Sequence, residues 1–239
     1  MKFLSTLLLV TLFLFSCTRK ETTNLQLTGN IAGLKKGTLY IQKIVDSTLT
    51  TIDTIPINGD AHFSSELNID APEMYYLHID RGTTKSLDDK LSFFAEPGII
   101  HIETSLEHFL SDAVVTGSKN QDKYDEFKKI MSRFNDEDLS LLELKFNAYK
   151  DHKVIQMDSI AKKQEINTKR KYLYVTNFAI TNSTMEVAPY VALTEIPDIN
   201  LKYMDTIQKA MAPKISNSLY GKKLKQLLAE RKRKETTSK

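Results

Sequence analysis

The chain has 239 residues, with 33 Lys and Arg against 30 Asp and Glu, and a single Cys. One cysteine excludes an internal disulfide, and it also excludes the pair of thiols that disulfide exchange requires. A formal net charge of +3 is far from the strongly basic balance of nucleic-acid-binding domains, so we expect no nucleic-acid partner.

The chain begins with a pattern typical of a secretory signal peptide, which we assign to residues 1–16. Lys2 gives a positive start, and residues 3–15 are almost wholly apolar. A membrane-spanning helix needs about 20 apolar residues, and this run is shorter and closely flanked by charge. We therefore expect export rather than a transmembrane helix.

The only cysteine lies directly behind this apolar run. Leu14, Phe15, Ser16 and Cys17 resemble a bacterial lipobox, although Phe15 is bulkier than is usual at the middle position. The resemblance implies acylation of Cys17, and several acyl chains, palmitate among them, make a lasting membrane anchor. Residues 17–23 would then be a short lipidated tether. The alternative is an ordinary signal peptide with an incidental cysteine.

Residues 24–117 have the pattern of strands. Short runs rich in Ile, Leu, Val, Tyr, Phe and Thr are separated by turn signals, and the Asn58-Gly59 pair is a strong hairpin signal. About eight such runs, with no helix-length pattern between them, predict an antiparallel β-sandwich or barrel-like domain.

Residues 118–232 have helical periodicity. Asn135 or Asp136 is expected to cap a new helix, whose apolar stripe contains Leu139, Leu142, Phe146 and Tyr149. A helix over residues 198–212 is expected to end at Pro213. The fold class is therefore α+β, a β domain followed by an all-helical region, with residues 233–239 as a basic disordered tail.

The end of the chain carries the sharpest cluster of charge, formed by Arg231, Lys232, Arg233 and Lys234. One interpretation is contact with anionic lipid headgroups or an acidic partner. The other, which we favour, is a solvated helix end whose cations suit the negative end of the helix dipole.

The pattern resembles a known arrangement in lipid-anchored periplasmic disulfide oxidoreductases of the ResA/TlpA type. The matching stretches of the strand-rich half are LTGNIAGLKKGTLYI, IDTIPINGDAHFS, FFAEPGIIHIE and VVTGSKNQDKYDEF. They resemble the all-β domain of unknown function that precedes the thioredoxin-like domain of those proteins. The helical half through NSLYGKKLKQL resembles their helical linker.

The sequence departs from that family at its catalytic part. No thioredoxin-like domain follows the helical region, and no Cys-x-x-Cys motif is present, so the redox activity does not carry over. The resemblance implies that this chain corresponds to the accessory part of such a protein, without its catalytic domain. A thioredoxin domain has been lost, or a separate chain supplies it; both readings stay open.

The strand-rich half contains two histidine–carboxylate pairs that could serve as metal ligands. His78 and Asp80 are one pair, and His101 and Glu103 are the other, each with the alternation that puts both side chains on one strand face. We favour the interpretation that they are polar residues of a half-exposed sheet. No cofactor is expected from the sequence, and no motif of a hydrolase, metalloprotease or nucleotide-binding site is present.

Aromatic residues at strand positions belong either to the hydrophobic core or to a binding patch on the surface. Tyr40, Tyr75, Tyr76 and Phe94 are of this kind, and core is the more typical use of such residues. A patch would suit a peptide, a glycan or a protein surface.

These observations together predict a non-catalytic, lipid-anchored envelope protein that binds or scaffolds another envelope protein. The resemblance implies that it is accessory to a periplasmic thioredoxin-like protein. The expected location is the outer membrane, facing the periplasm. The alternative is a metal- or small-ligand-binding protein, or an enzyme, that uses the strand His, Asp and Glu residues.

Overall fold

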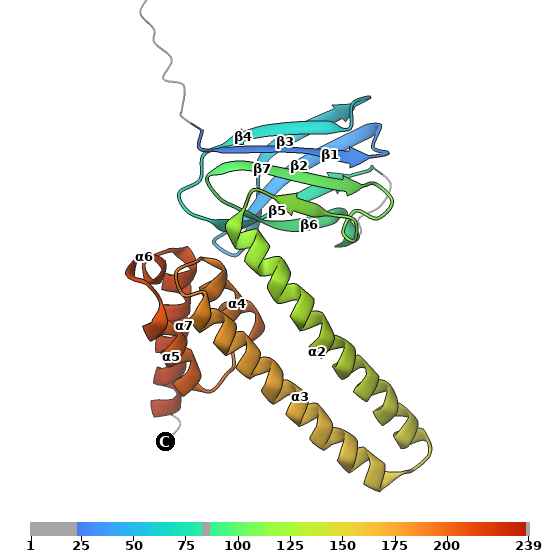
Figure 1. The fold of residues 1–239 in the computed structure, drawn as a ribbon, viewed down its shortest axis with the longest axis vertical. Coiled ribbons are helices and arrows are strands. Elements are labelled where there is room, and N and C mark those ends of the chain that lie inside the picture. Colours follow the sequence, from blue (N-terminus) through green and yellow to red (C-terminus); the bar gives the residue numbers. More distant parts are fainter. Residues whose placement is uncertain (1–22, 83–86, 238–239) are drawn as a thin grey trace, which may run out of the picture.

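The computed structural model describes residues 23–82 and 87–237, and it consists of a two-sheet β half followed by a helical half (Figure 1). The predicted α+β class is confirmed. The signal-peptide and lipobox residues, Cys17 among them, lie outside the described residues.

The β half contains two four-stranded sheets. The first has the order β4 (His62–Leu67), β1 (Leu25–Ala32), β7 (Gly98–Ser105) and β8 (Val114–Thr116). The second has the order β3 (Thr48–Asn58), β2 (Lys36–Val45), β5 (Glu73–Asp80) and β6 (Lys90–Ala95), with a short 3-10 turn η2 (Leu87–Asp89) before β6. Neighbouring strands are antiparallel except β1 and β7, which run parallel.

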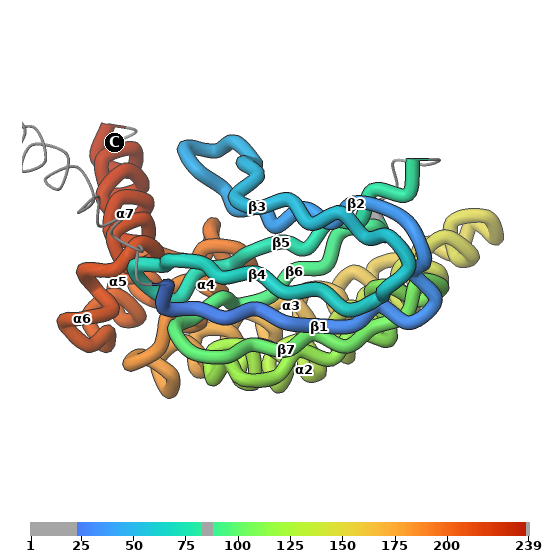
Figure 2. Tube along the Cα trace, turned by 90° about the horizontal axis from the view of Figure 1, so that it is seen from above, coloured from blue at the N-terminus to red at the C-terminus, as the bar shows by residue number. Residues whose placement is uncertain are grey.

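The alternation of apolar residues places one face of each sheet in a shared core. This core is formed largely by Leu25, Leu27, Ile31, Leu39, Ile41, Phe63, Leu67, Tyr75, Leu77, Ile79, Phe93, Ile100 and Ile102. The hairpin expected at Asn58-Gly59 is wrong, because β3 pairs with β2 while β4 pairs with β1 in the other sheet. Gly59, whose φ of +96° favours glycine, instead turns the chain from one sheet to the other. Figure 2 shows the tip of the β2–β3 hairpin reaching beyond the rest of its sheet.

The helical half begins two residues after β8. Its helices are α2 (Lys119–Lys150), α3 (Val154–Thr181), α4 (Val187–Glu195), α5 (Leu201–Ala210), α6 (Pro213–Ser216) and α7 (Leu219–Thr237). Helices α2 and α3 form a long hairpin, which we call the arm. The arm runs away from the β half, while α4 to α7 gather in a compact group beside its base (Figure 1).

Three expectations about helix ends are wrong. Asn135 and Asp136 do not cap a new helix, because α2 continues through them as one helix that packs against α3. The modest propensity cost of Asn and Asp inside a helix is smaller than the gain from that packing. Pro213 does not close a helix over 198–212; instead α5 ends at Ala210, and Pro213 opens α6, where its missing N–H costs nothing.

The third wrong expectation concerns the basic tail. Residues 233–237 are helical rather than disordered, since α7 continues to Thr237. Lys232, directly before this stretch, forms an ion pair with Asp205 of α5, with Nζ and Oδ1 2.6 Å apart. This contact helps to hold the end of α7 against its neighbour.

The helical half covers part of the outer face of the second sheet. Met74 of β5 and Phe94 of β6 point out of the β core and belong to the helical core, with Phe127, Val175 and Leu224 among its members. No helix in the described part of the chain is long and apolar enough to cross a membrane.

Candidate functional site

Two buried hydrogen bonds join the two halves, and a third joins two helices of the helical half. The N–H of Met74 donates to the Tyr220 hydroxyl on α7 at 2.8 Å, and the N–H of Phe94 donates to Oε1 of Gln121 on α2 at 2.9 Å. Asn120 accepts from the N–H of Val187, which ties α2 to α4. The N–H groups of Met74 and Phe94 are therefore satisfied by the helical half, and these bonds fix its position on the sheet.

Aromatic rings fill the space around these bonds. Phe94, Tyr124, Tyr190 and Tyr220 make a chain of edge-to-face contacts with centroids 5.1 to 5.7 Å apart. Burial raises the pKa of Tyr190 and of Tyr220 well above its ordinary value, so both hydroxyls stay protonated at physiological pH. The predicted core role is thus confirmed for Phe94, and also for Tyr75, which lies between the sheets.

A cleft of about 580 Å³ lies where the β2–β3 hairpin meets α7. Its lining includes residues of the hairpin tip, of the β4–β5 connection and of the start of α7, among them Lys43, Asp70, Glu73, Ser218 and Lys223. Charges of both signs line this cleft. Lys43 and Glu73 already form an ion pair in its wall, with Nζ and Oε2 3.3 Å apart.

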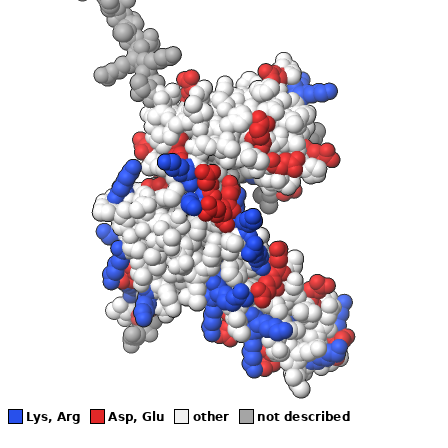
Figure 3. Space-filling model, viewed as in Figure 1, with Lys and Arg blue, Asp and Glu red and all other residues white. Residues whose placement is uncertain are grey.

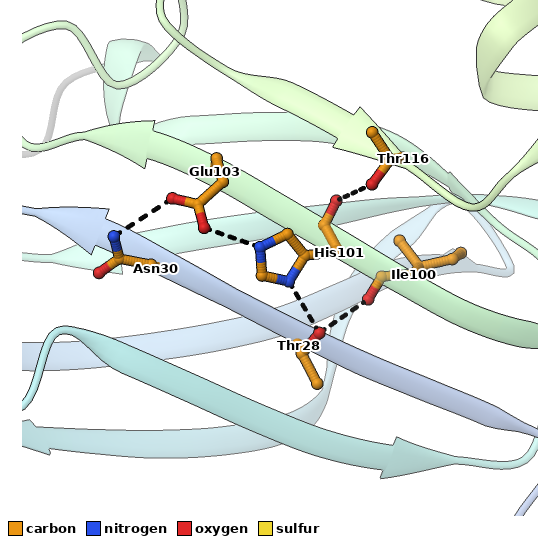
Figure 4. Close-up of polar contacts among 6 residues, drawn as sticks. All are labelled: Thr28, Asn30, Ile100, His101, Glu103 and Thr116. Carbon is orange, nitrogen blue, oxygen red and sulfur yellow. Dashed lines mark hydrogen bonds and ion pairs between the residues drawn. The ribbon is translucent and has the colours of Figure 1, made fainter.

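The pair His101 and Glu103 lies on the outer face of the first sheet (Figure 4). His101 Nε2 is 2.7 Å from Glu103 Oε1, and His101 Nδ1 is 2.9 Å from the Thr28 hydroxyl of β1. Asn30 Nδ2 donates to the other oxygen of Glu103 at 3.2 Å. The hydrogen bonds to His101 and Asn30 lower the pKa of Glu103, so this carboxylate is charged at neutral pH.

A hydroxyl, an imidazole and a carboxylate in a row have the order of a nucleophilic triad. Here, however, the side chains of His101 and Glu103 are 43% and 50% exposed on an open sheet face. Such a face admits water and offers no wall to hold a substrate. What the network does is to link β1 to β7, the one parallel pair of strands in the described chain.

The second predicted pair lies elsewhere. His78 and Asp80 are on β5 of the other sheet, where the His78 ring stacks with Tyr40 at a centroid distance of 5.8 Å. Asp80 accepts a hydrogen bond from the N–H of Gly82. The structure does not bring the two pairs together. Within residues 23–82 and 87–237, no group of three or more His, Cys, Asp or Glu side chains is placed to hold a metal ion.

The basic residues near the end of α7 are partly used within the fold. The guanidinium of Arg231 donates to the carbonyl oxygens of Pro197, Asp198 and Ile199, the connection between α4 and α5. Lys232 is paired with Asp205, as described above. Arg233 and Lys234 are exposed. Half of the predicted contact surface therefore has a structural role.

The feature that sequence reasoning missed is on the arm. The predicted apolar stripe of Leu139, Leu142, Phe146 and Tyr149 lies on a helix, but all four side chains are exposed. The outer part of the arm has a small core of its own, made by Leu141, Ala148 and Ile160. The periodicity of the stripe was visible in the sequence, whereas its exposure was not. Acidic and basic side chains intermingle along the arm (Figure 3).

Comparisons with known proteins identify the β half only in general terms. The profile of a domain of unknown function (DUF4369) matches residues 25–124, so such a domain is present there. No curated protein matches the chain. Among solved structures, the chain is similar to transthyretin from Sparus aurata, with 16% identity over 40% of this chain and 100% of that chain and a TM-score of 0.29. A likeness of that size carries no functional argument.

Proposed function

We propose that the protein is a lipid-anchored protein of the bacterial cell envelope that binds or scaffolds other proteins and has no catalytic activity of its own. Its anchor is Cys17, and its place is the outer membrane, facing the periplasm. Its ResA/TlpA-type resemblance makes a periplasmic thioredoxin-like protein the natural candidate for the partner that it assists.

The observation that carries the proposal is the arm. Its outer part exposes large apolar side chains, which cost free energy in water and mark contact sites for other molecules when they gather on one element. These exposed residues are Leu139, Leu142, Leu144, Phe146, Tyr149, Val154, Ile155 and Ile166. The β half and α4 to α7 contain the two main cores, so the fold does not need these side chains for burial.

The position of the arm suits a scaffold. The described chain begins at residue 23, two residues before β1 of the β half, and the tip of the arm lies at the far end of the molecule (Figure 1). Helix α2 has 32 residues, which corresponds to about 48 Å at about 1.5 Å per residue. An anchored molecule would therefore present its apolar residues at a distance from the membrane that holds it.

The binding role is tested by crosslinking in intact cells, followed by mass spectrometry of what the full chain captures. The arm variant is Leu142→Glu with Phe146→Glu, and the matched control is Ile99→Glu, an exposed apolar residue of β7. We expect captured envelope proteins to depend on the arm residues and not on Ile99. Identical capture by all three chains would contradict the proposal.

The anchor is tested separately with labelled fatty acid. The wild-type chain is expected to take up the label and to fractionate with membranes, and Cys17→Ser is expected to do neither. Label uptake by the Cys17→Ser chain would contradict lipidation at this residue.

A second candidate function, binding of a small charged ligand, is favoured by the cleft between the β2–β3 hairpin and α7. Its lining of Lys43, Lys223, Asp70 and Glu73 suits a ligand that carries both signs of charge, such as a zwitterion. Thermal unfolding with and without amino acids tests it. A midpoint shift that Lys223→Glu abolishes would support this candidate, and no shift with any of them would remove it.

A further inference from the structure

An apolar stripe on the outer half of α2 is covered by no other segment in the described part of the chain. Leu139, Leu142, Phe146 and Tyr149 are 67, 57, 56 and 68% exposed. Their alternating spacing of three and four residues is that of the contact positions of a coiled coil. Leu141, which packs toward α3, directly precedes Leu142, and successive helical residues are about 100° apart. The stripe thus faces sideways from the arm, where a further helix can lie.

Charged residues flank this stripe in a definite order. On one flank, Asp136, Glu143 and Lys150 follow one another at intervals of one heptad, so the flank begins acidic and ends basic. The other flank borders α3, and on it Asp138, whose Oδ1 accepts a hydrogen bond from Asn167 of α3, is followed by Lys145. Charged residues at such flanking positions set partner choice and orientation in coiled coils.

The order of the flanks disfavours a parallel pair of these helices. In a parallel pair, each charged residue of the second flank faces the next charged residue toward the C-terminus on the partner's first flank. Asp138 would then face Glu143, and Lys145 would face Lys150, so every such contact would join like charges. In an antiparallel pair, each flank of one helix lies along the same flank of the other helix, which runs in the opposite direction. Asp136 of each copy then meets the partner's Lys150. Glu143 then lies opposite its own counterpart, near the two-fold axis.

We propose that this stripe is a self-association surface, on which a second copy of the same chain packs its α2 in antiparallel orientation about a two-fold axis. The proposal rests on the binding role proposed above and names the partner of the arm. A two-fold interface requires a surface that is complementary to itself, and a stripe with one acidic and one basic end has that property. Attachment to one membrane would favour the pairing further by raising the local concentration of the chain.

Disulfide trapping tests the orientation. The full chain carrying Cys17→Ser, kept in mild detergent because of its apolar residues 3–15, provides a cysteine-free background. Glu143→Cys is expected to form a linked dimer on mild oxidation. Leu139→Cys is expected not to link to itself, but to link to a chain carrying Tyr149→Cys. The control is Ser64→Cys, on the exposed face of β4, which is expected to stay monomeric.

Sedimentation of the same background chain tests the affinity. We expect a dimer, a rise of about tenfold or more in its Kd for Leu142→Glu with Phe146→Glu, and no change for Ile99→Glu. Asp136→Lys is expected to weaken the dimer by like-charge repulsion, and adding Lys150→Asp to the same chain is expected to restore it. Restoration by the double reversal is a result that a merely unfolded variant would not give.

Several outcomes would overturn the proposal. These are a monomer at all concentrations, self-linking of Leu139→Cys as in a parallel pair, or a dimer that tolerates both stripe substitutions. The proposed binding role fails differently, in cells. A monomeric chain that still captures an envelope protein through Leu142 and Phe146 would remove self-association and keep the binding role. In another outcome, the chain forms the expected dimer while its stripe variant captures the same envelope proteins as the wild type. That result would show that the stripe does not capture those proteins, and it would leave the self-association proposal standing.

Discussion

The hydroxyl of Tyr220 on α7 accepts a hydrogen bond from the main-chain N–H of Met74 on β5, two residues 146 positions apart in the chain. Both groups are buried at the junction of the two halves. Met74 lies one residue beyond the last pair of β5 with β2, which is Tyr75 opposite Lys43. The helical half therefore completes the hydrogen bonding of the sheet as well as covering its apolar face.

Removal of this hydroxyl is predicted to destabilise the whole chain. Tyr220→Phe keeps the ring contacts but leaves the N–H of Met74 buried and unpaired, which costs about 1 to 3 kcal/mol in free energy of unfolding. Urea unfolding of the full chain measures the loss. Tyr203→Phe, on the exposed part of α5, is the control and is expected to change little. Equal midpoints for the two variants would contradict the prediction.

A buried carboxylate at the same junction is predicted to make stability depend on pH. Glu186 is 3% exposed, and burial raises its pKa above the ordinary value of 4.5, against the opposing effects of the Ser218 hydrogen bond and Lys214. Between 4.5 and the raised folded value, the folded chain holds more protons than the unfolded chain. The free energy of unfolding contributed by this group therefore falls as pH rises through that window.

Glu186→Gln is expected to remove this part of the pH dependence. The Gln side chain keeps an oxygen that can accept the hydrogen bond from the Ser218 hydroxyl, which is 2.6 Å from Glu186 Oε2, and it carries no charge. Urea unfolding at acidic and at neutral pH measures the effect, with exposed Glu230→Gln as the control. The variant should gain stability relative to wild type as pH rises. A constant difference between the two chains at all pH values would refute the assignment.

Much of the β half could be predicted from the sequence because its signals are local. Strand alternation and turn residues depend on neighbours in the chain, and the chain turns at Gly59 as the pattern indicates. The pattern did not show that the strands on either side of this turn belong to different sheets and form no hairpin. The same alternation placed His101 on a solvent-facing side of β7, as expected from Ile100 and Ile102 on either side of it.

The helical half was predicted less well because periodicity shows an apolar face without showing what covers it. The stripe at Leu142 and Phe146 has the period of a core face, yet no described helix lies against it. Conversely, Phe94 is on the outward side of its strand and is fully buried, because α2 and α4 pack over it. The exposure of the stripe and the burial of Phe94 both depend on tertiary contacts, which the pattern of neighbouring residues in the sequence does not show.

A single amide within the arm is predicted to set its local stability. Asn167 of α3 is fully buried, and its Nδ2 donates to the Phe134 carbonyl oxygen at 2.9 Å and to Asp138 Oδ1 at 2.7 Å. Asn167→Asp removes this donor and places a second carboxylate against Asp138. We expect the free energy of opening the arm to fall by about 2 to 3 kcal/mol, or the pKa of the new carboxyl group to rise so that it becomes protonated.

Hydrogen exchange of the α2 and α3 amides measures this effect, because it reports local opening and the outer part of the arm has a small core of its own. Asn147→Asp, on the exposed side of α2, is the matched control and should leave the exchange unchanged. Equal protection in the two variants would show that the buried amide does not hold the arm together.

The strand histidines give the last prediction, which separates the binding role from a metal site. His101 and Glu103 supply two ligands at most, and both are already engaged, by Thr28 and Asn30 as well as by each other. Structural zinc sites use four ligands, so Zn²⁺ at micromolar concentration is expected to leave the thermal unfolding midpoint of the full chain unchanged, and a chelator is expected to do the same. A midpoint that rises with Zn²⁺ in the wild-type chain, and not in His101→Gln, would establish a metal site on this sheet face and remove the case for a purely structural network.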